Sequence, residues 1–167
     1  MKNTLVIIFA LITLQSCKRD NSKIYSTFES EFNDSIEKEN AKKFDFECDG
    51  LTRQSSYFIN SKLKFMTLRI AGESVVTEYM IYFDRNTDSI SKSIVKLTKY
   101  EWDKTGNNVD WDNYSDTIYA IDYKQKKMKT FVENKIVSDT KAKNMLLENK
   151  KYIIGIKDCT EKKYNSR

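Results

Sequence analysis

The chain of 167 residues contains no histidine, no proline and only four glycines. Without histidine, it cannot form the Ser-His-Asp or Cys-His arrangements of common hydrolases, or the usual histidine zinc sites. So few glycines leave no glycine-rich phosphate loop or dinucleotide-binding fingerprint, and the nucleophile motif G-x-S-x-G is missing as well. We therefore expect a protein that is not an enzyme and that needs neither a cofactor nor a metal.

A strong excess of one charge is also missing. Lys and Arg number 29 against 24 Asp and Glu, which gives a net charge of +5, and the charges are scattered along the chain. A nucleic-acid-binding protein concentrates its basic residues on one face, so we expect no nucleic-acid partner. The densest basic cluster is typical of a solvated hairpin turn, with a lipid-headgroup or nucleic-acid patch as the alternative. It consists of Lys124, Lys126, Lys127 and Lys129.

One apolar run stands at the N-terminus, from Leu5 to Leu14, after a single charge at Lys2. It is shorter than the roughly 20 helical residues that a bilayer requires. A basic start, an apolar run and small residues, in this order, are typical of an export signal, which we assign to residues 1–16.

The run ends in Leu14-Gln15-Ser16-Cys17, which resembles the lipobox of bacterial lipoproteins. The resemblance implies cleavage after Ser16 and a diacylglycerol on Cys17. One acyl chain, at roughly 0.8 kcal/mol per buried methylene, holds a protein only marginally, whereas two or three hold it stably. The resemblance therefore makes the membrane a partner of this protein through its lipid anchor. An ordinary secretory signal and an uncleaved anchor are the alternatives.

The polar residues 17–25 predict a tether between the anchor and the domain. Abundant Lys, Asn and Ile without Pro resemble the composition common in the Bacteroidota, where an acidic stretch after the cysteine sends some lipoproteins to the cell surface. That stretch is missing here, because Asp20 stands among three basic residues. We therefore expect a cell-envelope protein on the outer membrane, facing the periplasm.

Residues 26–167 are long enough for a single domain with its own core. A helix is predicted over 26–43, because Ser26 and Glu29 fit a capping box and Phe28, Phe32 and Ile36 recur every four residues. This apolar stripe is narrow, which favours a helix that lies along a sheet.

From residue 44 the apolar pattern changes to a period of two, which indicates strands. We expect strands at 44–48, 55–59, 62–70, 75–83, 93–102, 117–123, 127–132 and 152–156, with a short helix at 140–150 before the last. Both faces of segment 75–83 are partly apolar, so this strand is expected to be central. The fold class is thus α+β: a mainly antiparallel sheet, meander or barrel-like, with an N-terminal helix.

Cys48 and Cys159 lie 111 residues apart, each at the end of a predicted strand. An exported chain meets an oxidising compartment, where two thiols tend to form a disulfide. We predict this bridge, which would tie the first strand to the last. Free buried thiols or a redox site remain alternatives, although neither cysteine belongs to a CxxC motif.

A predicted loop near residues 100–114 carries aromatic rings and acids together. Such rings stack on the apolar faces of sugars while carboxylates accept hydroxyl protons, although packing within the sheet and a solvated hairpin explain the same residues. The candidate ligand-binding residues are Tyr100, Trp102, Asp110, Trp111, Asp112 and Tyr114.

Three functions fit these features. We favour a non-enzymatic envelope lipoprotein whose loop binds a protein, a glycan or a small ligand. An immunity or inhibitor lipoprotein directed against a toxin or a hydrolase is the alternative. A glycan hydrolase that uses Asp110 and Asp112 as paired acids comes last.

Overall fold

The computed structural model describes residues 21–45, 47–48, 50, 52–84, 87, 89–137 and 141–167. These residues form two helices, α1 (Ser22–Lys38) and α2 (Lys141–Asn165). The strands between them are β1 (Lys42–Phe44), β2 (Arg53–Ile59), β3 (Lys62–Ala71), β4 (Val75–Phe83), β5 (Ile90–Trp102), β6 (Val109–Asp122), β7 (Lys127–Val132) and β8 (Lys135–Val137).

The eight strands form one antiparallel sheet in which the spatial order follows the order in the chain. Tight turns permit this meander. Asn60 and Ser61 join β2 to β3, and Glu133 and Asn134 join β7 to β8, all four with positive φ, as two-residue hairpin turns require. The sheet is open, so the α+β meander is confirmed and the barrel-like alternative is wrong.

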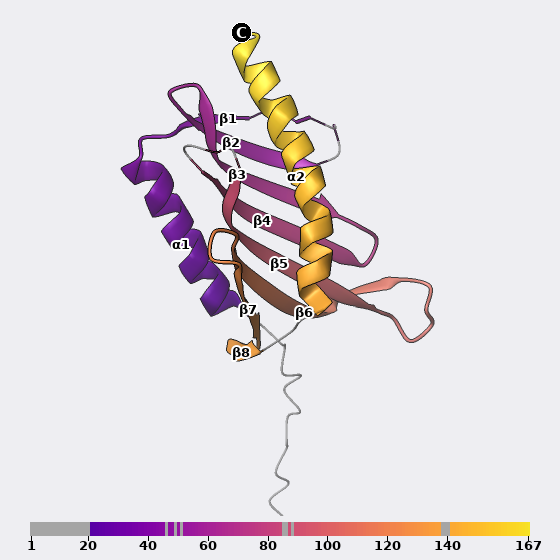
Figure 1. Ribbon diagram of the computed structural model, residues 1–167. Helices are drawn as coiled ribbons and strands as arrows, with labels where there is room; N and C mark the ends of the chain where they lie inside the picture. Colours follow the sequence, from indigo (N-terminus) through magenta and orange to yellow (C-terminus); the bar gives the residue numbers. More distant parts are fainter. Residues whose placement is uncertain are drawn as a thin grey trace, which may run out of the picture.

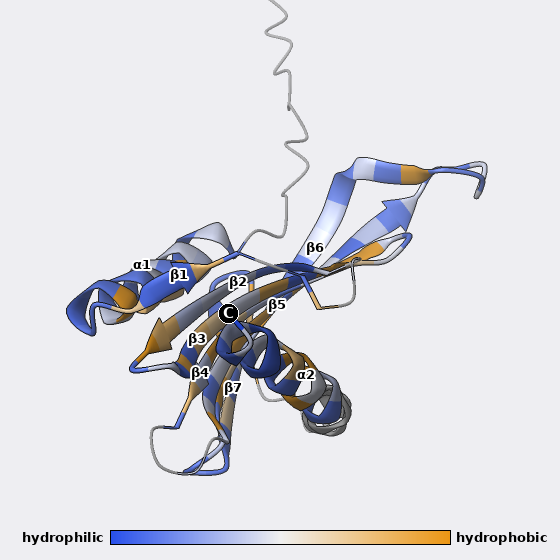
Figure 2. Ribbon diagram, turned by 90° about the horizontal axis from the view of Figure 1, so that it is seen from above, coloured by the Kyte–Doolittle hydropathy of each residue, from blue (hydrophilic) through white to orange (hydrophobic). Residues whose placement is uncertain are grey.

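The two helices cover opposite faces of the sheet (Figures 1 and 2). On one face, Phe32 of α1 is buried, and its ring makes edge contacts with the rings of Phe65 and Tyr82. On the other face, Ile153 and Ile156 of α2 belong to the larger core cluster. The predicted docking of the N-terminal helix along a sheet is therefore confirmed.

Strand β4 explains why two helices are needed. Tyr79, Ile81 and Phe83 pack in the cluster beneath α2, whereas Met80 packs in the cluster beneath α1. Alternate side chains of a strand point to opposite faces, so a strand that is apolar on both faces must be covered on both. Its predicted central position is confirmed, with three strands before it and four after it in the sheet.

The C-terminal region was predicted wrongly. Residues 152–156, expected to form the last strand, belong to α2, which is a long helix that follows the last strand β8 rather than a short one that precedes it. A short apolar run fits both a strand and a helix, and the deciding pattern is the spacing of Ile153, Ile156 and Thr160, all buried on one side of α2. No helix in the described part of the chain is long and apolar enough to cross a membrane.

The N-terminal boundary also differs from the prediction. Helix α1 begins at Ser22, four residues before the expected start and inside the predicted tether, so Ser26 does not cap it. The boundary is set by Asn21, whose buried Nδ2 donates to the Asp116 carbonyl at 2.7 Å. Its Oδ1 accepts from the backbone N–H of Asn134 at 2.6 Å. These tertiary bonds attach the helix start to β6 and to the β7–β8 turn, and a local sequence pattern does not reveal them.

Cys48 and Cys159 form the predicted disulfide, with their Cα atoms 6.1 Å apart. Neither residue ends a strand, however. Cys48 lies in the connection between β1 and β2, and Cys159 lies on α2. The bridge therefore fastens the helix that covers one face of the sheet to the segment at the sheet's edge.

Replacing both cysteines, Cys48→Ser with Cys159→Ser, is expected to lower the free energy of unfolding by about 2–4 kcal/mol, because the unfolded chain regains the freedom that a long closed loop removes. Urea unfolding of the variant beside the wild type measures this loss. The wild type in reductant is the matched control and should unfold like the variant. If the oxidised wild type and the variant were equally stable, the disulfide would not stabilise the fold, which would contradict this prediction.

Candidate functional site

The end of the β5–β6 hairpin, residues 99–115, is the main candidate site, and we call it the hairpin arm. β5 and β6 are the longest strands, with 13 and 14 residues. Figures 1 and 2 show their joined ends reaching beyond the sheet, where neither helix covers them. The loop expected near residues 100–114 is thus largely strand, with a tight turn at its tip.

Asp103 organises that turn. Its Oδ1 accepts hydrogen bonds from Thr105 Oγ1 at 2.6 Å and from the backbone N–H groups of Thr105 and Asn107 at 3.0 and 3.2 Å. Its Oδ2 accepts from Asn108 Nδ2 at 3.3 Å. Gly106 adopts a φ of 71°, which glycine tolerates at no steric cost. Donors on the Asp103 carboxylate, the Thr105 hydroxyl first, lower its pKa to about 2.

A register shift shapes the side of the hairpin arm. Tyr100 is paired with Tyr114, but the next residue of β5, Glu101, is paired with Asp110. Residues 111–113 therefore have no partner on β5 and bulge outward. Within this bulge the backbone N–H of Asp112 donates to Asp110 Oδ1 at 3.1 Å.

The bulge brings three of the four predicted rings together. The Tyr100 ring centroid lies 4.8 Å from that of Trp111 and 5.8 Å from that of Tyr114. Trp111 is nonetheless 60% exposed. Trp102 is 43% exposed and makes no ring contact with another described residue. The arm thus presents one tryptophan supported by a tyrosine and a second that stands alone.

The two acids predicted to bind a ligand, Asp110 and Asp112, serve different roles. Asp110 binds the amide of Asp112, whereas the side chain of Asp112 is exposed in the bulge. Within the described residues no group of three or more acidic or cysteine side chains could hold a metal ion. Asp112, unlike Asp110, thus keeps an exposed carboxylate that no other residue of the arm uses.

A second polar region lies on the sheet face beside α1, and sequence reasoning missed it. Arg69 Nε is 3.8 Å from Glu78 Oε1, and Lys96 Nζ is 3.7 Å from both Glu78 Oε2 and Asp116 Oδ2. The buried Asp116 also accepts from Thr98 Oγ1 at 2.7 Å. These charges come from β3, β4, β5 and β6, so only the register of four strands brings them together.

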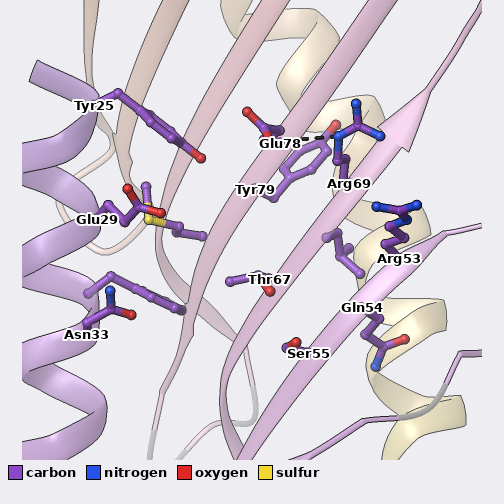
Figure 3. Close-up of a pocket in the computed structure, with 13 residues that line it drawn as sticks. Tyr25, Glu29, Asn33, Arg53, Gln54, Ser55, Thr67, Arg69, Glu78 and Tyr79 are labelled. Atoms are coloured by element: carbon purple, nitrogen blue, oxygen red, sulfur yellow. Dashed lines mark ion pairs between the residues drawn. The ribbon is translucent and has the colours of Figure 1, made fainter. Parts of the chain in front are cut away.

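Helix α1 forms the other wall of a half-open groove of about 280 Å³ along this region. Figure 3 shows Tyr25, Glu29 and Asn33 of α1 facing the polar side chains of β2, β3 and β4 across it. Burial, together with the negative charge of Glu78 and Glu29, raises the pKa of Tyr25. The Tyr25 hydroxyl therefore keeps its proton and remains a hydrogen-bond donor.

The basic cluster lies where the sequence predicts a hairpin turn. Lys124 and Lys126 belong to the turn between β6 and β7, and Lys127 and Lys129 begin β7. Cys17, the predicted lipidation site, lies outside the described residues.

No protein-family model, curated protein or solved structure matches this chain significantly.

Acid titration tests the organisation of the turn. Because the pKa of Asp103 is lowered from 3.8 to about 2, its hydrogen bonds stabilise the turn above the ordinary carboxyl pKa and are lost as the pH falls through about 2. The amide resonance of Asn107, followed by NMR, should shift with that low midpoint. In Thr105→Ala the midpoint should rise, because the first donor is gone. A midpoint near 3.8 in the wild type would contradict the bonded geometry.

Proposed function

We propose that this protein is a non-enzymatic binding protein of the cell envelope whose recognition element is the hairpin arm. The observation that carries the proposal is the exposure of Trp111 on a protruding hairpin, where the Tyr100 ring holds it in place. A large ring that is exposed in the free protein gains the most from burial by a partner.

The energetics of recognition support a tryptophan that is already held in position. Hot spots at interfaces are enriched in Trp and Tyr and contribute 2 kcal/mol or more each. Ordering a side chain on binding costs about 0.5–1.5 kcal/mol, and a ring fixed beforehand avoids part of that cost. Packing of Trp111 against Tyr100, together with the turn held by Asp103, supplies this order.

The partner is a protein or a glycan of the envelope. The exposed face of Trp111 offers a platform for the apolar side of a sugar ring, and the exposed carboxylate of Asp112, the next residue in the chain, accepts hydrogen bonds from sugar hydroxyl groups. The alternative, an immunity or inhibitor lipoprotein, uses the same arm, since a projecting hairpin can enter the cleft of a toxin or hydrolase. Binding to a purified glycan and binding to an enzyme distinguish the two.

The proposal includes a lipid anchor on Cys17 that holds the domain at the outer membrane, on its periplasmic side. The side chain of Asn21 is already fixed against β6 and the β7–β8 turn. Three residues then lie between Cys17 and Asn21, and the four Cα–Cα steps from Cys17 to Asn21 span at most roughly 14 Å. The anchor therefore keeps the domain close to the membrane surface, unlike a long flexible tether.

Replacing the exposed ring, Trp111→Ala, is expected to weaken capture of the envelope partner about 30-fold, which corresponds to the loss of roughly 2 kcal/mol at a hot spot. Pull-down from solubilised envelope and binding to an array of envelope glycans measure this loss. Ile136→Ala on β8, also an exposed apolar side chain, is the matched control and should bind normally. Undiminished capture by the Trp111 variant would exclude the arm as the recognition element.

The anchor has its own test. Cys17→Ala in the full-length chain is expected to move the protein from the membrane fraction to the soluble fraction, because no acyl acceptor remains. Metabolic labelling with a fatty acid should mark the wild type and not the variant, while Cys48→Ser with Cys159→Ser should still be labelled. An unlabelled wild type, or equal labelling of the Cys17 variant, would refute lipid anchoring.

A further inference from the structure

Two guanidinium groups line the groove beside α1, and only one of them has an ion-pair partner among the described residues. Arg53 and Arg69 are direct cross-strand partners on β2 and β3, and both line the groove. Like charges at directly opposed positions destabilise a sheet. The ion pair with Glu78 compensates Arg69, as the dashed line in Figure 3 marks. Arg53, by contrast, has no ion pair or hydrogen bond with any residue that the structure describes.

The opposite wall of the groove carries unused acceptors. Glu29 and Asn33 are one helical turn apart on α1 and both line the groove, so their side chains lie on the same side of the helix. Neither side chain forms an ion pair or hydrogen bond within the described part of the chain. Between the two walls, Thr67 of β3 places its hydroxyl on the floor (Figure 3).

The charges of the groove select the kind of ligand. Arg53 offers a guanidinium without an ion-pair partner among the described residues, and its cross-strand neighbour Arg69 adds a second positive charge. A guanidinium binds the two oxygens of a carboxylate through paired N–H bonds. The acidic groups Glu29 and Glu78 equal the two arginines in number, so a dianion such as phosphate would meet repulsion. A ligand with one carboxylate and one ammonium group satisfies both walls and removes the repulsion between the arginines.

We propose that this groove binds a small zwitterion, an amino acid or a dipeptide, with its carboxylate on Arg53 and Arg69 and its ammonium group on Glu29. The Thr67 hydroxyl on the floor bonds the polar atoms between the two charged ends. The volume of about 280 Å³ accommodates a molecule of this size.

Isothermal titration of the full-length protein in detergent with diglycine tests the proposal. Diglycine is expected to bind saturably, whereas diglycine amide, which lacks the carboxylate, and N-acetyl-diglycine, which lacks the ammonium group, should each bind at least tenfold more weakly. Inorganic phosphate should not compete. These comparisons need no variant, so they hold even if a substitution disturbs folding.

Two variants assign the ends of the ligand. Arg53→Gln should weaken diglycine binding at least tenfold, and it should remain folded because it removes a like-charge contact. Glu29→Gln should weaken diglycine but leave the weaker binding of N-acetyl-diglycine unchanged. Lys42→Gln on β1, an exposed basic residue outside the groove, should bind like the wild type.

The opposite results would overturn the proposal. Absence of saturable diglycine binding, equal binding of the amide, full binding by Arg53→Gln or effective competition by phosphate would each exclude a zwitterion site. The site is separate from the hairpin arm, so Trp111→Ala should leave diglycine binding unchanged. If diglycine does not bind in the groove, the proposed role of the arm is unaffected, and the reverse also holds.

Discussion

Apolar side chains on both faces of the central strands are the constraint on which the rest of this structure depends. In β4, Ile81 is buried toward α2 while Met80 is buried toward α1. Each face must be removed from water, because burial of apolar surface is the main favourable term in folding. In this meander of eight strands the turns are too short to cover a face. The segments before β1 and after β8, which form α1 and α2, cover the two faces instead. The bridge from Cys48 to Cys159 then fastens the second cover in place.

The extent of the two helices also decides where the core ends and where the two candidate sites, the groove and the hairpin arm, begin. Each helix covers only part of the sheet face on which it lies. The charged side chains of Arg69, Glu78 and Lys96 therefore lie beside α1 rather than beneath it. The hairpin arm extends past both helices, and its rings must support one another without a core behind them. Tyr100 and Trp111 do so across the register shift. Both sites are therefore places where the two-helix cover ends.

The sequence predicts the parts of this architecture that depend on local patterns. Periods of two indicate the strands, and the two apolar faces of segment 75–83 indicate a central strand. Two cysteines in a chain that is expected to be exported indicate a bridge. Local sequence patterns do not predict features that depend on tertiary contacts. Ile153 and Ile156 fit a strand as well as a helix until the sheet face that they cover is known, and Asn21 starts α1 through bonds to distant residues. The Arg53–Arg69 pair depends on a register that no local signal defines.

The central claim is that the hairpin arm is an ordered element that stands exposed in the folded protein. The chain has two tryptophans, and both lie in this arm, so intrinsic fluorescence reports on the arm alone. Acrylamide quenching of the folded full-length protein, with near-UV circular dichroism on the same sample, measures exposure and order together. We expect emission typical of tryptophan in water, efficient quenching, and a dichroism signal that disappears on unfolding. Emission at short wavelength that acrylamide cannot reach would contradict an exposed arm, and a missing dichroism signal would contradict an ordered one.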